Sequence, residues 1–399
     1  MMELVLWGSA GIVGFTYLGF PLLVLLRARV RPRPVAAADV TPSVSVIIAA
    51  HDERASIGPR IDNLLALDYP RERLEIVVAS DGSTDDTVAV ARSRGETAVR
   101  VLDLPRVGKA TALNRAVEAS TGEILVFSDA NTAFAPDAIR ALVRSFADPE
   151  VGGVAGNQVY GDLTAPERRE TGDATAAGAG ERRYWDFDRI LKVAESLGGN
   201  VISATGAIYA LRRELFRTVP DGVTDDFVTS TRVIQQGRRL VFEPDAMAFE
   251  PVAGSSKREY RRKVRIMTRG LRGVSYVRSL LDPRRYGFYS VQLFVHKVLR
   301  RMMALPLLAI GLASLALWDH GNPLYRLLAV GQAALYGLAA IGLGLRDRPE
   351  GQRPWFSLPA FFALVNIASL HALWNLVSGR RIDRWEPNRV VELPAEAEG

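Results

Sequence analysis

The chain has 399 residues, of which 48% are hydrophobic and 24% are charged. Its formal net charge is +6 and its pI about 9.6, values that fit either a nucleic acid or an anionic membrane surface as a partner. Cysteine is absent, which excludes disulfides, thiolate metal sites and cysteine nucleophiles. A mean hydropathy of +0.07 beside so much charge indicates that apolar blocks are separated from a polar part.

The first element in chain order is an uncharged apolar stretch at residues 4–26, long enough to span a bilayer core. It has no basic start and no small-residue cleavage site, so it is predicted to be an anchor and not a signal peptide. Three more apolar stretches follow the middle of the chain, at residues 302–318, 324–345 and 355–377. The sequence therefore predicts four membrane segments and a soluble middle.

Basic residues predict the orientation. RARVRPRP (27–34) directly follows the first apolar segment, and KREYRRKVRIMTRGLR (257–272) precedes the second. Positive charge favours the cytoplasmic side, so both blocks and the soluble part are predicted to be cytoplasmic. Because these blocks flank membrane segments and not an aromatic-rich surface, nucleic-acid binding is disfavoured. Three full crossings would leave the basic stretch 379–385 outside; either one segment is re-entrant or interfacial, or the tail departs from the rule.

The soluble part alternates two patterns. Apolar runs rich in β-branched residues are followed by segments with helical spacing. The predicted strands are residues 43–50, 74–80, 97–104 and 123–130, and the predicted helices are residues 53–68, 83–94, 108–120 and 135–147. This order predicts an α/β domain with a mostly parallel sheet and crossover helices. Ligands of such domains bind at the carboxyl ends of the strands.

Charged side chains stand at those strand ends. Glu53 follows the first strand, Asp81 the second, Lys109 the third and Asp129 the fourth. Asp129 and Asn131 lie two residues apart and would present oxygen ligands on one face, which suits Mg²⁺ or Mn²⁺; the alternative is an ordinary Asx turn. Carboxylates gathered in one crevice repel unless a cation or a donor-rich ligand lies between them, so a metal-bound nucleotide is expected. Neither GxGxxG nor a P-loop is present.

Several motifs, in order, resemble family 2 glycosyltransferases of the GT-A fold. They are PSVSVIIAAHDE, VVASDGSTDDT, GKATALN, SDANT, ATGAIYALRRELF, TDDFVTSTRV and RRKVR. The resemblance covers about residues 43–275, and the predicted membrane layout is similar to that of hyaluronan, cellulose and poly-N-acetylglucosamine synthases.

The resemblance implies roles for the acidic residues. Glu53 and Asp81 would hold the nucleoside, normally uridine, and Asp129 with Asn131 would match the family's D-x-D metal motif. Asn131 departs from that motif because an amide brings no charge to the cation. Asp226 would be the general base of an inverting transfer, with Asp225 as the alternative. Lys109 joins the expected nucleotide-sugar site.

Other residues are expected around the diphosphate and the acceptor. Arg262 and Arg265, one helical turn apart, would bind the diphosphate where processive synthases have Q-x-x-R-W; without that Gln and Trp, processivity is in doubt. Thr205 and Gly206 are expected near the acceptor. Tyr184 and Trp185 would stack on a sugar or belong to an amphipathic helix docked on the membrane. Residues 165–180 are predicted to form a loop near the crevice.

The predicted organisation is a transmembrane helix (1–27), a linker (28–42), a GT-A domain (43–275), an amphipathic or interfacial segment (276–301), three apolar membrane segments (302–378) and a polar tail (379–399). The predicted function is hexosyl or N-acetylhexosaminyl transfer from a nucleotide sugar, expected to be a UDP-sugar, to a lipid or growing glycan. It would serve cell-wall, cell-surface polysaccharide or glycolipid synthesis at the cytoplasmic face of the plasma or inner membrane. Export subunits are candidate partners. The alternative is a non-catalytic nucleotide-sensing subunit of a polysaccharide export complex.

Overall fold

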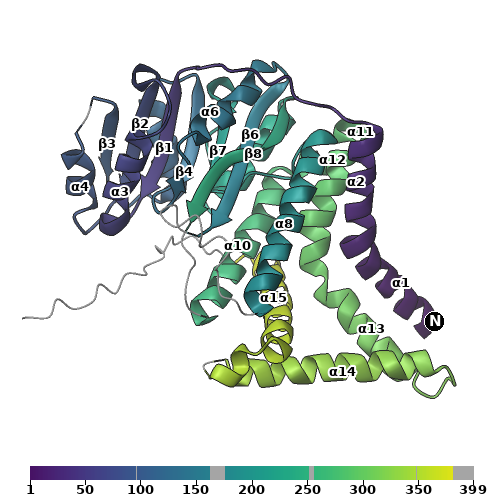
Figure 1. The fold of residues 1–399 in the computed structure, drawn as a ribbon. Coiled ribbons are helices and arrows are strands. Elements are labelled where there is room, and N and C mark those ends of the chain that lie inside the picture. The colour runs from purple at the N-terminus through teal and green to yellow at the C-terminus, as the bar shows by residue number, and fades with distance from the viewer. Residues whose placement is uncertain (96, 162–175, 251–255, 347, 381–399) are drawn as a thin grey trace, which may run out of the picture.

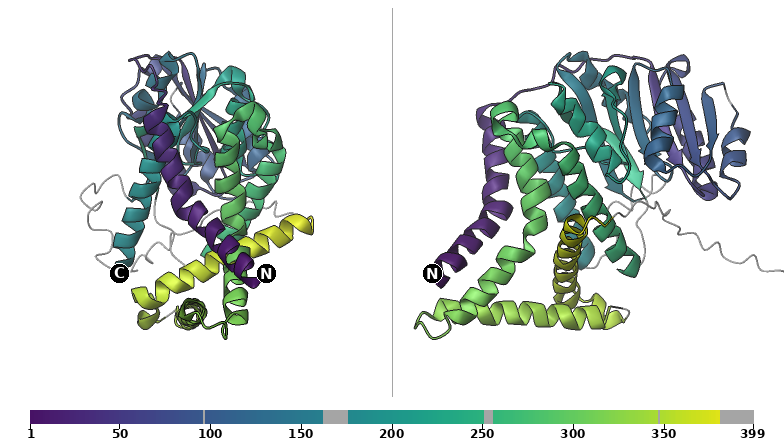
Figure 2. Two further views of the ribbon diagram at one scale, coloured as in Figure 1. Left: turned by 90° about the vertical axis from the view of Figure 1, so that its right-hand side faces the viewer. Right: turned by 180° about the vertical axis from the view of Figure 1, so that it is seen from behind.

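The computed structural model describes residues 1–95, 97–161, 176–250, 256–346 and 348–380. A sheet domain occupies one end of the molecule, and long apolar helices extend from its side (Figure 1). Figure 2 shows the same two parts from the side and from behind. Helices α8, α10 and α12 lie between the sheet and the other helices, so they form the boundary of the two parts.

The sheet has eight strands in the order β3-β2-β1-β4-β7-β6-β8-β5. The strands are β1 (Val44–Ala50), β2 (Leu74–Asp81), β3 (Val99–Leu104), β4 (Ile124–Asp129), β5 (Ala133–Phe134), β6 (Val151–Tyr160), β7 (Tyr209–Arg212) and β8 (Arg239–Glu250). β1 pairs in parallel with β2 and β4, and β2 with β3, which confirms the predicted parallel arrangement. β7 runs antiparallel to β4 and β6, so the sheet is mixed beyond β4.

The described helices carry the chain between the strands and away from the sheet. They are α1 (Met2–Gly14), α2 (Phe20–Val30), α3 (Arg54–Leu65), α4 (Thr87–Ser93), α5 (Lys109–Ala119), α6 (Ala138–Arg144), α8 (Ala176–Leu197), α9 (Asp225–Gln235), α10 (Ser256–Tyr276), α11 (Pro283–Tyr286), α12 (Phe288–Leu293), α13 (Ala304–Ala316), α14 (Pro323–Gly344) and α15 (Pro354–Val377). Two π-helical turns, η1 (Phe15–Gly19) and η6 (Phe294–Val298), and the 3₁₀ turn η7 (Leu299–Met302) join neighbouring helices.

Two hydrophobic cores cover the faces of the sheet. Successive residues of a strand point to opposite faces, so Val46 and Ile48 pack with α3 and α6, whereas Ile47 packs with α5 and α9. The second core also includes Tyr289 and Leu293 of α12. Tyr289 Oη donates a hydrogen bond to the Ile202 carbonyl at 2.8 Å. The helical part is therefore attached to the sheet domain through a shared core.

Three described helical stretches are long and apolar enough to cross a membrane: Met2–Val30, Pro323–Gly344 and Pro354–Val377. A fourth candidate is the pair Phe288–Met302 and Ala304–Ala316, which is bent by 52° and is either a broken span or a re-entrant loop. These correspond to the four predicted apolar segments. In Figures 1 and 2, α14 lies crosswise to α15.

One sequence prediction needs correction. Residues 176–180, expected to belong to a loop, form the first turns of α8. The Ala-rich composition favours a helix there, and the two glycines do not prevent it. Residues 165–175 of the predicted loop lie outside the described part of the chain.

Candidate active site at the carboxyl edge of the sheet

Strand β4 ends at Asp129, and Ala130 and Asn131 form the turn that follows. The Thr132 N–H donates to the Asp129 carbonyl at 3.5 Å, which closes this turn. Asn131 therefore does not lie on the strand, and the expected shared strand face does not apply to it. The structure has a turn directly after the acidic end of the strand. A turn at Ala130 and Asn131 and a metal-ligand role for Asp129 therefore do not exclude each other.

Lys109 joins two carboxylates from distant parts of the chain. Its Nζ donates to Asp129 Oδ1 at 2.9 Å and lies 3.3 Å from Asp225 Oδ2. Burial lowers the pKa of Lys109, but Asp129 and Asp225 raise it more, so the pKa lies above its usual range and the ammonium group stays charged. We call Lys109, Asp129 and Asp225 the strand-end cluster; it brings together the ends of β4, α5 and α9.

Asp81 organises the loop in front of Lys109. Its carboxylate is fully buried, and Oδ1 accepts hydrogen bonds from the N–H groups of Val107 and Gly108, both at 2.7 Å. Oδ2 lies 3.2 Å from Arg106 Nη1. Gly82 has a φ of +60°, and a Cβ at this position would lie 2.7 Å from the backbone nitrogen of Arg106. This turn therefore requires glycine. Asp81 therefore positions the loop that carries Arg106, Val107 and Gly108, and its carboxylate is not exposed in this structure.

Glu53 lies after the carboxyl end of β1, immediately before α3. Its N–H donates to Thr87 Oγ1 at 2.7 Å, which ties the loop after β1 to the start of α4. Burial raises the pKa of Glu53 to about 6, and the negative charge of Asp129 contributes to the rise, while a bond from Ser56 opposes it. A partly buried carboxylate near other acids is suited to a ligand that brings hydrogen-bond donors.

Asp225 and Asp226 begin helix α9 and turn to different neighbours. Asp225 is paired with Lys109, whereas Asp226 Oδ1 accepts the Phe227 N–H at 2.7 Å. The pKa of Asp226 is raised to about 7: burial is the largest cause, the charge of Asp225 adds to it, and the charge of Lys109 opposes both. A carboxyl group with a raised pKa is suited to accepting a proton near neutral pH.

Asp226 also lines a cavity of about 310 Å³, which we call the α8 cavity. Its walls come from α8, from residues 202–205, from the start of α9, from α10 and from η6–η7. Its ionisable lining residues are Asp188, Lys192, Glu195, Asp226, His296, Lys297, Arg300 and Arg301. Except for Asp226, sequence reasoning missed these residues. The pattern HKVLRR, placed directly before an apolar segment, is the signal that could have indicated them.

Thr205 and Gly206 lie at the junction of the two regions. Thr205 lines the α8 cavity, and its Oγ1 is buried with no hydrogen-bond partner among the described residues. A buried hydroxyl without a partner is a candidate ligand contact. Gly206 faces the strand-end cluster instead, because a Cβ there would lie 3.0 Å from Asp129 Oδ2. The two predicted acceptor residues therefore contact different regions.

The other predicted residues lie on α8 and α10. Arg262 and Arg265 are half-buried on α10, three residues apart. Burial raises the pKa of Glu250, and the charge of Asp129 adds to this, while Arg262 lowers it, so Glu250 lies within electrostatic range of both Asp129 and Arg262. Tyr184 and Trp185 belong to α8, but their side chains lie outside the described part of the structure.

The oxygen donors fit a divalent cation only with help from a ligand. Within the described ranges, no group of three or more His, Cys, Asp or Glu side chains is arranged to hold a metal ion. Asp129 offers a carboxylate and Asn131 an amide oxygen, both suited to hard cations, but Asp129 Oδ1 already accepts from Lys109. Such a site fits Mg²⁺ or Mn²⁺ if phosphate oxygens complete the coordination.

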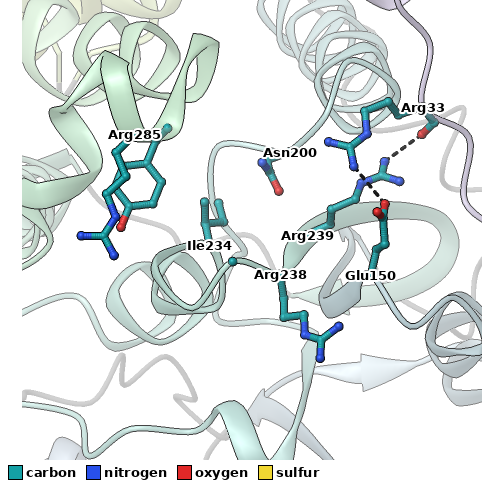
Figure 3. Close-up of a pocket in the computed structure, with 9 residues that line it drawn as sticks. Arg33, Glu150, Asn200, Ile234, Arg238, Arg239 and Arg285 are labelled. Carbon is teal, nitrogen blue, oxygen red and sulfur yellow. Dashed lines mark hydrogen bonds and ion pairs between the residues drawn. The ribbon is translucent and has the colours of Figure 1, made fainter.

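A second cavity, of about 350 Å³, lies at the opposite edge of the sheet, where β6 and β8 begin (Figure 3). Its arginines serve the fold. Arg239 donates to the carbonyls of Arg33 and Gly199 at 2.8 and 3.1 Å. Arg33 in turn pairs with Glu150 at 2.9 Å. These bonds attach the segment after α2 to the sheet domain, so this cavity is not a candidate active site.

Comparisons with known proteins show which proteins this chain resembles. Residues 45–219 match the family described as Glycosyl transferase family 2. This part of the sheet domain is therefore similar to family 2 glycosyltransferases, and its fold matches that of a solved glycosyltransferase. This finding favours the predicted enzyme over the non-catalytic sensing subunit.

Three similar proteins illustrate the range of this family. The chain is 25% identical over 245 residues to poly-β-1,6-N-acetyl-D-glucosamine synthase of Staphylococcus aureus (strain COL), covering 60% of this chain and 56% of that protein. It is 33% identical over 159 residues to β-monoglucosyldiacylglycerol synthase of Nostoc sp., covering 38% of this chain and 34% of that protein. The chain thus spans about half or less of these curated relatives. The mannosyltransferase PcManGT from Pyrobaculum calidifontis, solved with GDP-Man and Mn²⁺, has a TM-score of 0.69 at 25% identity, covering 96% of this chain and 100% of that one.

Proposed function

We propose that the chain is an inverting, metal-dependent membrane glycosyltransferase that uses Asp226 as its general base. The observation that carries this proposal is the divergence of two adjacent acids. Asp225 pairs with Lys109 at 3.3 Å on the side of Asp129, whereas Asp226 lines the α8 cavity. The donor sugar would lie at the strand-end cluster and the acceptor in the α8 cavity, with the reacting atoms between them.

The donor side would be held by charge. Asp129 and Asn131 would hold the divalent cation together with the diphosphate of a nucleotide sugar, and Glu53 would face the nucleoside. The cation supplies neutralisation of the charge that develops on the leaving diphosphate. Lys109, whose charge is secured by Asp129 and Asp225, would contact the same phosphates. Arg262 and Arg265 on α10 would add positive charge at the edge of the crevice.

The transfer step would proceed by direct displacement. The acceptor hydroxyl oxygen forms a bond to the anomeric carbon, and the bond from that carbon to the diphosphate oxygen breaks. The hydroxyl proton goes to Asp226, and the nucleoside diphosphate leaves with the bonding electron pair. A pKa of about 7 suits Asp226 to this role, because a base with a pKa near the working pH balances availability with basicity.

The donor nucleoside and the acceptor class are open to direct assay. The family resemblance favours a UDP-sugar, whereas the structurally similar mannosyltransferase was solved with GDP-Man. The curated relatives are named for a polysaccharide and for a glucosyl lipid, which supports glycan and lipid acceptors. The test is to incubate purified protein in lipid nanodiscs with UDP- and GDP-sugars and Mn²⁺ or Mg²⁺, and to measure nucleotide release. Absence of release with every donor would contradict the proposal.

We further propose a membrane topology with the sheet domain and the end of α15 on the same, cytoplasmic side. Helix α10 directly follows the sheet domain, and α15 packs beside it. His371 lies 3.1 Å from Tyr260, and Arg272 donates a hydrogen bond to the carbonyl of Arg380. One apolar segment would then not cross completely, and the bent pair around α13 is a candidate. Reporter fusions after residue 399 should be active only as cytoplasmic reporters; activity of a periplasmic or extracellular reporter would contradict this topology.

The polar residues of α15 support helix packing. Asn366 Nδ2 donates to the Phe362 carbonyl of its own helix at 2.9 Å. Asn375 Nδ2 approaches Thr268 Oγ1 of α10 at 3.5 Å, and His371 contacts Tyr260 of the same helix. We propose that these contacts, within α15 and between α15 and α10, hold the two helices together.

A further inference from the structure

The α8 cavity contains more positive than negative charge. Its lining includes four lysine and arginine side chains, Lys192, Lys297, Arg300 and Arg301, and three acids, Asp188, Glu195 and Asp226. Asp188 pairs with Lys192 at 2.8 Å, and Glu195 lies 2.9 Å from His296 Nε2 and accepts the Ile202 N–H at 3.0 Å. Lys297, Arg300 and Arg301 line the same wall as Asp226. Clustered half-buried cations favour an anionic ligand.

The positions of these cations are fixed by the surrounding helices. Lys297 Nζ lies 5.0 Å from the centre of the ring of Phe227, the residue that follows Asp226. Arg301 Nη1 donates to the Lys297 carbonyl at 2.9 Å. A Cβ at Gly270 would lie 2.5 Å from Arg301 Nη2, so Gly270 on α10 leaves the space that this guanidinium occupies. The cavity is thus preorganised for a charged ligand.

The same cations stand at the foot of an apolar helix. Lys297 belongs to the π-helical turn η6, a feature that is frequent at functional sites, and Arg300 and Arg301 precede the 52° bend before α13. On α13, the side chains of Leu305, Leu308 and Leu312 are 44%, 50% and 70% exposed. A molecule with an anionic head and a long apolar tail would match the cations of η6 and η7 followed by the exposed leucines of α13.

We propose that the acceptor is a lipid that carries a phosphate or diphosphate group close to its acceptor hydroxyl. This inference rests on the proposed function. Arg300, Arg301 and Lys297 would bind the phosphate oxygens, and the apolar tail would lie along α13. The hydroxyl would then lie beside Asp226, which takes its proton as the new glycosidic bond forms. In this arrangement the hydroxyl is the nucleophile, and the phosphate only binds the acceptor to the three cations.

The rival occupant of the cavity is the diphosphate of the donor. It is disfavoured because Lys109 and Asp129 are linked on the other side of Asp225, at the end of β4. A neutral glycan or diacylglycerol is also disfavoured, because it would leave the three cations without an anionic partner. Both alternatives are outcomes of the experiments that follow.

The first experiment measures binding without a donor. The full chain in detergent is mixed with a polyisoprenyl diphosphate or with the polyisoprenol of the same chain length, and bound lipid is measured by native mass spectrometry. The diphosphate should bind roughly 10-fold tighter or more, and Arg300→Glu should abolish that preference while polyisoprenol binding stays unchanged. Arg284→Glu, at an exposed arginine of α11, is the matched control. Equal binding of the two lipids, or equal loss in both variants, would overturn the proposal.

The second experiment measures transfer to two lipid-linked sugars that differ only in the phosphate group. Wild-type enzyme should have a KM roughly 10-fold lower for the phosphate-bearing acceptor. Arg300→Gln should raise that KM and leave the donor KM unchanged, whereas Arg300→Lys should retain most of the preference. A rise in the donor KM would assign the cavity to the donor, and equal KM values would assign it to a neutral acceptor; either result overturns the inference. Absence of nucleotide release with every donor would contradict the proposed function. The binding experiment needs no donor, so it would still test the phosphate site in the α8 cavity.

Discussion

The strand-end cluster and the α8 cavity meet at the first two residues of α9, but they are built differently. In the cluster, the single cation of Lys109 contacts two carboxylates, those of Asp129 and Asp225, so acids outnumber the cation. In the cavity, the lysine and arginine side chains outnumber the acids. An excess of carboxylates favours a further cation such as a divalent metal ion, whereas an excess of cations favours an anion.

The two regions also differ in where their residues come from. The cluster is carried by the ends of one strand and two helices of the sheet domain. The cavity combines α8, α9 and α10 with the turns η6 and η7, so it requires the helical part to be docked on the sheet. Damage to the cluster should therefore impair donor chemistry with every acceptor, whereas damage to the cavity should depend on the acceptor.

The largest expected effect is at Asp129. Asp129→Ala removes the charged oxygen ligand and should lower transfer by roughly 10³-fold or more, because a divalent cation contributes several kcal/mol at a leaving diphosphate. Excess EDTA should have the same effect on the wild type, and added Mn²⁺ should restore it. The measurement is nucleotide release together with product formation. Asp137→Ala, at an exposed residue before α6, is the control; full activity in EDTA would exclude a metal at this site.

The next effect separates the two adjacent acids. Asp226→Asn keeps the shape of the side chain and removes the base, so transfer should fall by roughly 10²–10⁴-fold. Nucleotide affinity should stay near the wild-type value, because Asp226 lies on the cavity side. Asp225→Asn should instead weaken donor binding, since it removes one partner of Lys109. If Asp225→Asn alone showed loss of transfer with intact nucleotide binding, the base would be Asp225.

The pH profile should report the same base. Asp226 must be deprotonated to act, and burial raises its pKa to about 7. The value of kcat/KM should therefore fall about 10-fold for each pH unit below this pKa and level off above it. Asp225→Asn should move this limb to lower pH, because it removes a negative charge that raises the pKa of Asp226. A limb that stays in place in Asp225→Asn and is still present in Asp226→Asn would belong to another group.

The sequence predicted the cluster far better than the cavity, for a physical reason. Parallel strands bring their carboxyl ends to one edge of a sheet, so motifs after successive strands can be assigned to one site from their order alone. Lys109 and Asp129 were found in this way. The pairing of Lys109 with Asp225 was not, because it depends on how α9 returns to the sheet.

The cavity could not be assembled from sequence patterns. In the sequence, Lys297, Arg300 and Arg301 are basic residues beside a membrane segment. Contact with anionic lipid headgroups is enough to explain positive charge at such a place. Glu195 and His296 are about a hundred residues apart, and only the docking of α12 and η6 on α8 brings them together. The buried position of Asp81 was also not predictable, since its bonds to the N–H groups of Val107 and Gly108 depend on the fold of the loop.

The smallest expected effect is at Asn131, and it refines the cluster. Asn131 lies in the turn after β4 and offers a neutral amide oxygen, whereas Asp129 ends the strand and offers a charged carboxylate. Asn131→Asp adds a negative charge next to a hard cation, which should tighten Mn²⁺ binding, but repulsion from Asp129 opposes the gain in the metal-free protein. We expect roughly 3–10-fold tighter binding, measured as a lower Mn²⁺ concentration at half-maximal nucleotide release, with the donor saturating. Asn131→Ala should shift the midpoint in the opposite direction. Identical midpoints in the three proteins would mean that Asn131 is not a ligand and that Asp129 and the diphosphate hold the cation without it.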